Sequence, residues 1–153
     1  MNLLKKIFLF IGLKPLIYFL LNIYSNFFQY HTIIRHGISY KIDLRESVDR
    51  GIFLFGWEPL TIEWLLGNLS KGDTVIEVGA NVGAHSLIIS SIIGEAGKLF
   101  CIEPTEYGFN KLSQNFSLNP MLKKNTDLIK AYASNDIAIK SENKIRSSWI
   151  INK

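Results

Sequence analysis

Cysteine is nearly absent from this sequence, and that scarcity limits its chemistry. The 153 residues include one cysteine, Cys101, which lies within an apolar run. A single thiol forms no disulfide within the chain, and it excludes a zinc site built on paired cysteines. A reducing, cytoplasmic compartment fits this composition. His31 and His36 have no acidic or cysteine partner at metal-ligand spacing, so we expect no metal site and place both on the surface, at strand ends or turns.

Acidic residues are missing from the first 42 positions, which carry five Lys or Arg. Residues 43–106 carry ten acids against four bases, and residues 107–153 carry eight bases against three acids. No cluster of Lys and Arg is interleaved with aromatic residues, so we expect no nucleic-acid partner. The run 43–50 mixes both signs of charge, and we expect it to form a solvated face.

The segment 1–30 is apolar and basic, but its hydrophobic run, 7–28, is split by Lys14 and Pro15. No small-residue cleavage site of the A-x-A kind follows, which argues against a removed signal peptide. Two alternatives remain. The segment is either a membrane span or a pair of short helices, which pack on the domain or lie on the inner membrane face with their basic side toward the lipid head groups. No linker or repeat divides the remainder, so we expect one domain over 31–153.

Apolar periodicity predicts an α/β domain for that remainder. A small hairpin is expected over 32–43 with its turn at Gly37. Pro59 suits the first turn of a helix over 60–69, and that helix is expected to bury Leu60, Trp64 and Leu65 on one face. The other expected elements are a strand over 74–78 buried on both faces, a helix over 82–93, a strand over 98–103, a helix capped by Thr105 with Phe109, Leu112 and Phe116 as its buried stripe, a strand over 127–133, and a weaker hairpin of 137–140 with 149–151.

The most informative segment joins two predicted strands through a glycine turn and a helix. Gly79 and Gly83 bracket the turn, where backbone without side chains can approach a ligand. Glu103 ends the second strand, where an acid in a nucleotide-binding βαβ unit accepts hydrogen bonds from ribose hydroxyls. Asn81 stands where the dinucleotide pattern G-x-G-x-x-G has its second glycine, which favours a ligand without a pyrophosphate. S-adenosylmethionine is such a ligand, and the charge of Glu77 suits its sulfonium cation better than phosphates.

Each of these residues also has a purely structural explanation. The glycines can form an ordinary tight turn, the turn amides can hold Glu77, and Glu103 can be an acid favoured at the start of a helix. The joint spacing of the four favours the cofactor site.

The same residues resemble a known family. The stretch G-D-T-V-I-E-V-G-A-N-V-G-A-H-S-L from Gly72, I-E-P at 102–104, A-Y-A-S-N at 131–135 and the upstream W-E-P at 57–59 are similar to the FkbM-type S-adenosylmethionine-dependent methyltransferases, which have the Rossmann-like class I methyltransferase fold. The resemblance covers roughly residues 38–150. It implies O-methylation of a hydroxyl on a sugar or other secondary metabolite, so the expected partner is a small-molecule or glycan acceptor. The cofactor-binding residues that it implies are Glu77, Gly79, Ala80, Asn81 and Gly83 toward the methionine end, Glu103 at the ribose, and Ala131, Ser134 and Asn135 along the adenine.

Members of that family continue into further strands of a seven-stranded sheet, whereas about three core strands are predicted here. We therefore expect a truncated domain that holds mainly the cofactor-binding half. Its strand 74–78 would have an uncovered edge, which invites self-association.

Three functions are consistent with the sequence. The first is methyl transfer, in which catalysis is mainly alignment and His85 is the one candidate base. The second is a non-catalytic remnant, or a module that binds the cofactor or docks on a membrane. The third is an NAD-dependent oxidoreductase, against which Asn81 argues.

Overall fold

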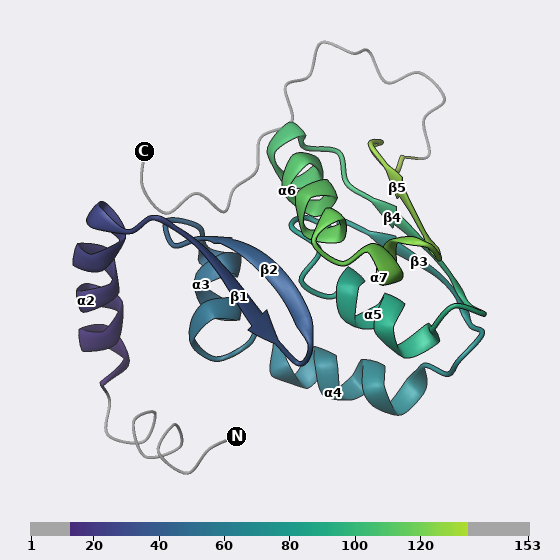
Figure 1. Cartoon of the computed structure of the whole chain (residues 1–153), viewed down its shortest axis with the longest axis horizontal. Helices are drawn as coiled ribbons and strands as arrows, with labels where there is room; N and C mark the ends of the chain where they lie inside the picture. The colour runs from purple at the N-terminus through teal and green to yellow at the C-terminus, as the bar shows by residue number, and fades with distance from the viewer. Residues whose placement is uncertain (1–12, 135–153) are drawn as a thin grey trace.

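The computed structural model describes residues 13–134. Its helices and strands are, in chain order, α2 (Lys14–Phe27), β1 (Tyr30–Arg35), β2 (Ile38–Asp43), α3 (Ser47–Leu54), α4 (Pro59–Asn68), β3 (Thr74–Val78), α5 (Ser86–Ile93), β4 (Lys98–Ile102), α6 (Glu106–Ser117), α7 (Pro120–Lys123) and β5 (Thr126–Ile129). The strands form an antiparallel hairpin of β1 and β2 and a parallel sheet in the order β3-β4-β5 (Figure 1). The structure confirms the expected α/β fold, with three core strands, a small hairpin and an apolar helix that precedes the hairpin.

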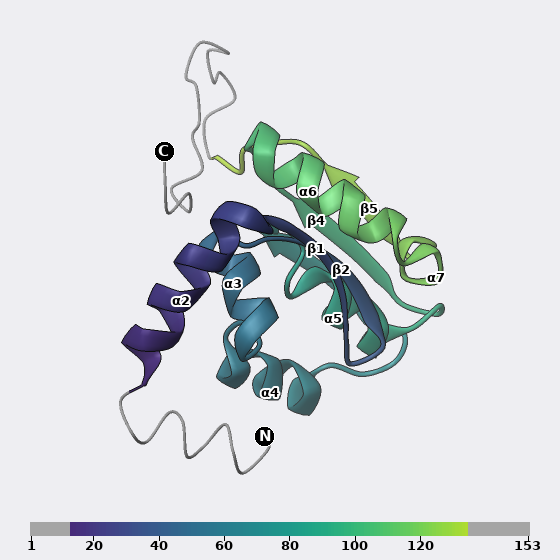
Figure 2. The same cartoon turned by 60° about the vertical axis from the view of Figure 1, so that its left-hand side comes forward.

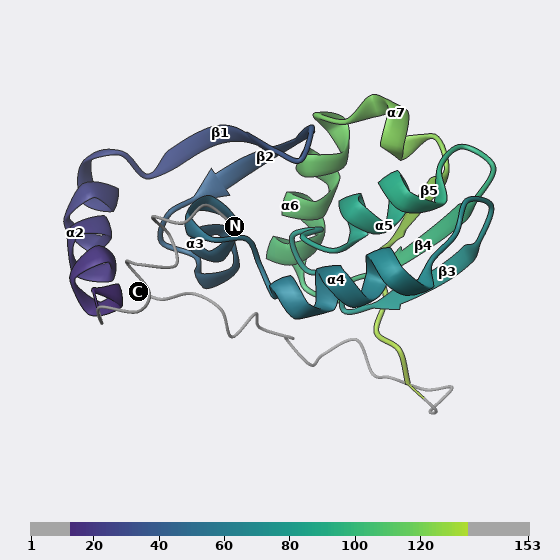
Figure 3. The ribbon, with the colours of Figure 1, turned by 90° about the horizontal axis from the view of Figure 1, so that it is seen from below.

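The parallel sheet is covered on one face by α5 and α6, which lie on the same side of it in Figures 1 and 3. Both crossovers step in the same direction across the sheet, and right-handed crossovers then place both helices on one face. Side chains from these helices, from the central strand and from the hairpin contribute to the core. Those with 0% relative exposure include Leu87, Ile93, Leu99, Leu112 and Phe116.

Burial of strand β3 on both faces was predicted, and that prediction is wrong for the part of the chain that the structure describes. Ile76 and Val78 are 65% and 63% exposed, because they point away from the face that carries α5 and α6. The edge of β3 is open, as expected, since β4 is the one strand paired with it among residues 13–134.

The hairpin packs against α6, far from it in sequence. Asn115 Oδ1 accepts a hydrogen bond of 2.8 Å from the Lys41 amide. Asn119 accepts one of 3.0 Å from the Ser39 amide and donates one of 2.7 Å to the Ser39 carbonyl. These bonds place β2 alongside α6, as Figure 2 shows.

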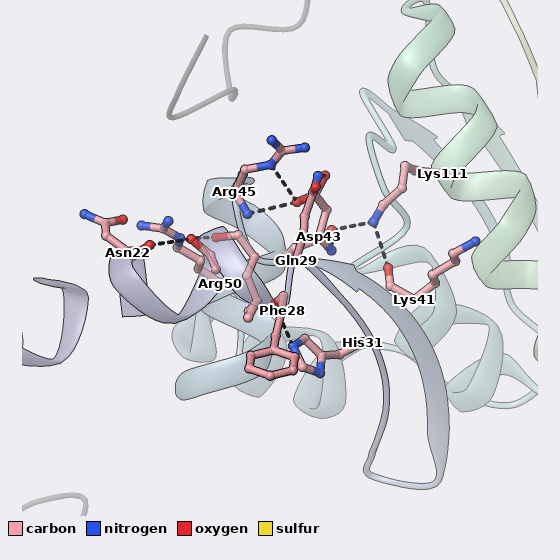
Figure 4. Close-up of polar contacts among 12 residues, drawn as sticks. Asn22, Phe28, Gln29, His31, Lys41, Asp43, Arg45, Arg50 and Lys111 are labelled. Carbon is pink, nitrogen blue, oxygen red and sulfur yellow. Dashed lines mark hydrogen bonds and ion pairs between the residues drawn. The ribbon is translucent and has the colours of Figure 1, made fainter. Parts of the chain in front are cut away.

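The run 43–50 does not form the expected solvated face. Asp43, Glu46, Asp49 and Arg50 are 8%, 5%, 0% and 2% exposed. The charge of Asp49 is matched by the ammonium group of Lys111, which also donates a hydrogen bond of 2.7 Å to the Lys41 carbonyl (Figure 4). The run is buried because its counter-charge comes from α6, 62 positions further along the chain.

Helix α4 forms where it was expected, but its predicted buried face is wrong. Leu60 and Trp64 are 79% and 60% exposed, and Leu65 alone of the three is buried. Nothing among the described residues covers the first two side chains.

Helix α2 occupies the later part of segment 1–30. It buries Leu21 and Ser25, while Phe19 and Phe27 are 59% and 78% exposed. Within residues 13–134, no helix combines the length and the apolar character that crossing a membrane requires.

Several element boundaries differ from the prediction for identifiable reasons. Helix α5 begins at Ser86 rather than at 82, because Asn81 and Gly83 have φ angles of 48° and 85°, which a right-handed helix excludes. Strand β5 ends at Ile129 instead of 133. The cap on α6 is confirmed, since Thr105 Oγ1 accepts a bond from the Gly108 amide. The hairpin predicted over 137–151 lies outside the described residues.

Candidate functional site

Three of the predicted segments meet at one edge of the parallel sheet. Because β3, β4 and β5 run parallel, their carboxyl ends lie along the same edge. The glycine turn follows β3, Glu103 follows β4, and Ala131 with Ser134 follows β5. Ligands of open α/β sheets bind at this edge.

The glycine turn after β3 combines an open position with a tightly packed one. Gly79 has a φ of 84°, and a Cβ built there would meet no atom within 4 Å. Gly83 has a φ of 85°, but its Cβ would lie 2.8 Å from Leu112 Cδ1. Ala80 between them is 4% exposed, so its side chain belongs to the core. Gly79 therefore leaves room for a ligand, whereas Gly83 allows the turn to pack on α6.

Four amides of this turn already have acceptors within the protein. The amides of Gly79 and Ala80 donate to the Ile102 carbonyl at 2.8 and 3.0 Å, and that of Gly83 donates to the Ala80 carbonyl at 2.9 Å. The Asn81 amide donates to Glu103 Oε2 at 2.8 Å. A turn that cradles phosphates directs free amides at the ligand. These four are not available in that way, which agrees with the sequence-based preference for a ligand without a pyrophosphate.

Glu103 joins the turn to the start of α6. Besides the Asn81 amide, its carboxylate accepts bonds from the Thr105 amide at 2.8 Å and from Thr105 Oγ1 at 2.5 Å. A carboxylate offers about four acceptor positions, so about one remains. Glu103 is 5% exposed, and its orientation is therefore set before any ligand arrives.

Glu77 does not face the turn amides. Its Oε2 accepts a bond of 2.5 Å from Ser86 Oγ and lies 3.8 Å from Cys101 Sγ. Burial raises the pKa of Glu77 to about 7, because removing the carboxylate from water disfavours its charged form. At neutral pH much of this group is uncharged, which weakens the electrostatic reason for pairing it with a cation.

His85 stands at the start of α5, where its ring is shielded. The side chain is 18% exposed, and Nε2 lies 3.6 Å from Glu58 Oε2. Burial lowers the pKa of His85, more than the nearby Glu58 raises it, so the ring is neutral at neutral pH. Its Nε2 atom is buried without a hydrogen-bond partner, which does not suit a base that must reach an acceptor.

Glu58 was not among the predicted site residues. The W-E-P motif at 57–59 was the available signal, but its contact with His85 depends on the packing of α4 beside α5.

The segment after β5 carries the residues expected along the adenine. Ala131 and Ser134 are exposed at the same sheet edge as the turn. Asn135 lies outside the described residues.

Comparison with known proteins relates this geometry to methyltransferases. The chain is 40% identical over 48 residues to a protein-L-isoaspartate O-methyltransferase of Methanococcus vannielii, a match that covers 31% of this chain and 23% of that relative. Among solved structures, the Pyrococcus horikoshii protein PH0793 matches with a TM-score of 0.52 and 19% identity, over 77% of this chain and 48% of that one. Trm5b of Pyrococcus abyssi matches with a TM-score of 0.52 and 16% identity, over 67% of this chain and 28% of that one. No protein-family model matches the chain.

A further solved structure corrects one prediction. The complex of aTrm5 with tRNALeu has a TM-score of 0.50 and 17% identity, over 67% of this chain and 28% of that one. The fold described here thus occurs in a protein that binds RNA, and the exclusion of nucleic acid was wrong. Charge clusters along the sequence do not report on a surface assembled by folding, as the burial of the run 43–50 demonstrates.

The chain spans about a quarter of the curated relative and less than half of these solved structures. The chain therefore shares the fold of these solved structures, and one segment of 48 residues is similar to part of a methyltransferase.

Proposed function

We propose that this chain binds S-adenosylmethionine at the carboxyl edge of β3 and β4 and supports transfer of its methyl group to an oxygen acceptor. The observation that carries the proposal is the bond of 2.8 Å between the Asn81 amide and Glu103 Oε2, since it holds an acid beside the turn, where that acid can accept a bond from a ribose hydroxyl. The acceptor position left on Glu103 suits one ribose hydroxyl, and the open space at Gly79 suits the passage of the ligand.

The bound cofactor supplies a methyl group on a sulfonium, which an acceptor oxygen can displace in line. The residues of this chain then bind the cofactor and align its methyl group with the acceptor oxygen, because in-line displacement depends mainly on the positions of the reacting atoms. The shielded, neutral ring of His85 is not required as a base in this proposal.

The occupied turn amides also separate this proposal from an NAD-dependent oxidoreductase. A pyrophosphate at this turn would compete with the carbonyls of Ile102 and Ala80 and with Glu103 for the same N–H groups. A ligand with a ribose but no pyrophosphate needs none of those bonds to break. In the non-catalytic alternative, the chain either holds the same cofactor site without turnover or serves only to dock on a membrane or partner.

The acceptor has two candidate classes. The resemblance to FkbM-type enzymes favours a hydroxyl of a sugar or other small molecule. A nucleic-acid acceptor is the second candidate, and the fold shared with the tRNA-bound aTrm5 favours it.

Thermal unfolding of the full chain with each ligand tests the cofactor. We expect S-adenosylmethionine at about 100 times its dissociation constant to stabilise the protein by about 2.7 kcal/mol, with no shift from NAD. A shift from NAD alone would refute the proposal. Incubation with methyl-labelled S-adenosylmethionine and either a glycan mixture or tRNA then separates the acceptor classes by the fraction that acquires label.

A further inference from the structure

Two acidic side chains lie beside the start of α5, and they differ in their surroundings. Glu77 is enclosed by Ser86 and Cys101, and its hydrogen bonds point into the protein. The side chain of Glu58 is 52% exposed and approaches His85 at 3.6 Å. A half-exposed carboxylate keeps part of its hydration, whereas charging an enclosed one incurs the full desolvation cost.

The fold brings Glu58 to the edge of the sheet where the glycine turn lies. Glu58 immediately precedes α4, which ends at Asn68 shortly before β3 begins. His85 directly precedes α5 and follows the turn, so the contact between the two side chains joins the start of α4 to the turn.

The conformation of Glu58 is unusual and defined by its neighbours. Its φ of 44° lies in the left-handed region, which it shares with His36 and Asn81 among the described non-glycine residues. Residues with such strained backbone persist where the surrounding structure holds them. Thr61 Oγ1 donates a bond of 3.2 Å to Glu58 Oε2, which orients the carboxylate.

We propose that Glu58, rather than Glu77, binds the α-ammonium group at the methionine end of S-adenosylmethionine; this assignment rests on the proposed function. An ammonium group carries three N–H donors for a carboxylate. A sulfonium has none and offers charge attraction alone. An ammonium site needs a carboxylate that a ligand can reach and that is held in one orientation. Among the described acids at this edge, Glu58 has a side chain that is exposed and that Thr61 orients.

Calorimetric titration of the full chain with two ligands tests the assignment. S-adenosylhomocysteine carries the ammonium group, whereas 5′-methylthioadenosine lacks the whole amino-acid part. We expect Glu58→Gln to weaken S-adenosylhomocysteine by about tenfold or more, the loss typical of a charge-assisted hydrogen bond, and to leave 5′-methylthioadenosine unchanged. Glu63→Gln changes an exposed acid within α4, is the matched control and should bind both ligands as the wild type does.

Three results would overturn the assignment. Unchanged affinity for S-adenosylhomocysteine in Glu58→Gln would remove Glu58 from the site. An equal loss for both ligands would indicate distortion of the edge instead of a lost ammonium contact. A greater selective loss in Glu77→Gln than in Glu58→Gln would return the role to Glu77. Failure of the wild type to bind either ligand is a separate outcome, because it refutes the proposed function itself.

Discussion

The backbone amide of Asn81 donates a hydrogen bond of 2.8 Å to Glu103 Oε2, and this bond connects the turn after β3 with the end of β4. Asn81 has a φ of 48°, so the turn presents its amide to the neighbouring strand end instead of continuing into α5. The carboxylate of Glu103, which we propose binds the ribose, is thus held in place by a backbone amide.

Gly83 and Gly79 should respond differently to alanine. Both have positive φ angles, so each substitution costs about 1–2 kcal/mol of backbone strain. At Gly83 the new Cβ also lies 2.8 Å from Leu112 Cδ1, which adds about 1–3 kcal/mol of over-packing. Urea unfolding should therefore show a larger loss of stability for Gly83→Ala than for Gly79→Ala. Equal losses would show that the Leu112 side chain moves away from the new Cβ without lowering the free energy of unfolding.

The ion pair of Lys111 with Asp49 should matter far more than a surface pair. Asp49 is 0% exposed, so Lys111→Met leaves a buried carboxylate without its counter-charge and should cost about 3–5 kcal/mol. Lys124→Met is the control, since Lys124 lies 3.8 Å from Glu95 with both side chains largely exposed, and it should cost less than about 1 kcal/mol. Chemical unfolding measures both, and similar small losses would contradict the burial of the run 43–50.

Titration of the Glu77 carboxyl group should lower the free energy of unfolding as pH rises. Its pKa is raised by burial to about 7, whereas an unperturbed glutamate titrates near about 4.3. Between these values the folded state keeps a proton that the unfolded state releases, so the free energy of unfolding decreases as pH rises through that window.

Glu77→Gln keeps the neutral form at every pH and tests this sign. Relative to the wild type, the variant should gain about 3 kcal/mol of stability between about pH 4 and pH 8. Urea unfolding across that range gives the difference curve. A flat curve would show that Glu77 is ionised in the folded state throughout.

The order of strand, turn, helix and strand in the βαβ unit was predicted from the sequence because the signals for these elements are local. The apolar strand segments, the glycine turn and the capping residue Thr105 each act within a few positions, and the structure has them where they were expected. The proximity of Glu103 to the turn followed from parallel pairing alone. The late start of α5 was missed because asparagine and glycine tolerate positive φ angles without requiring them, so the pattern did not show that Asn81 and Gly83 adopt them.

Long-range contacts account for the remaining differences. The run 43–50 appeared solvated because its partner Lys111 lies in a helix that the local pattern does not connect with it. Exposure of Leu60 and Trp64 depends on what packs against α4, which helical periodicity does not specify. Glu58 was missed at the site for the same reason, since its contact with His85 arises from the packing of two helices.

The central claim is that the edge formed by the turn and Glu103 holds S-adenosylmethionine, and calorimetric titration of Glu103→Gln tests it most directly. The control is Glu95→Gln, an exposed acid between α5 and β4, away from this edge. We predict that the wild type and the control bind S-adenosylmethionine equally, and that Glu103→Gln, still folded by circular dichroism, binds at least about tenfold more weakly. Equal affinity in all three proteins would contradict the claim.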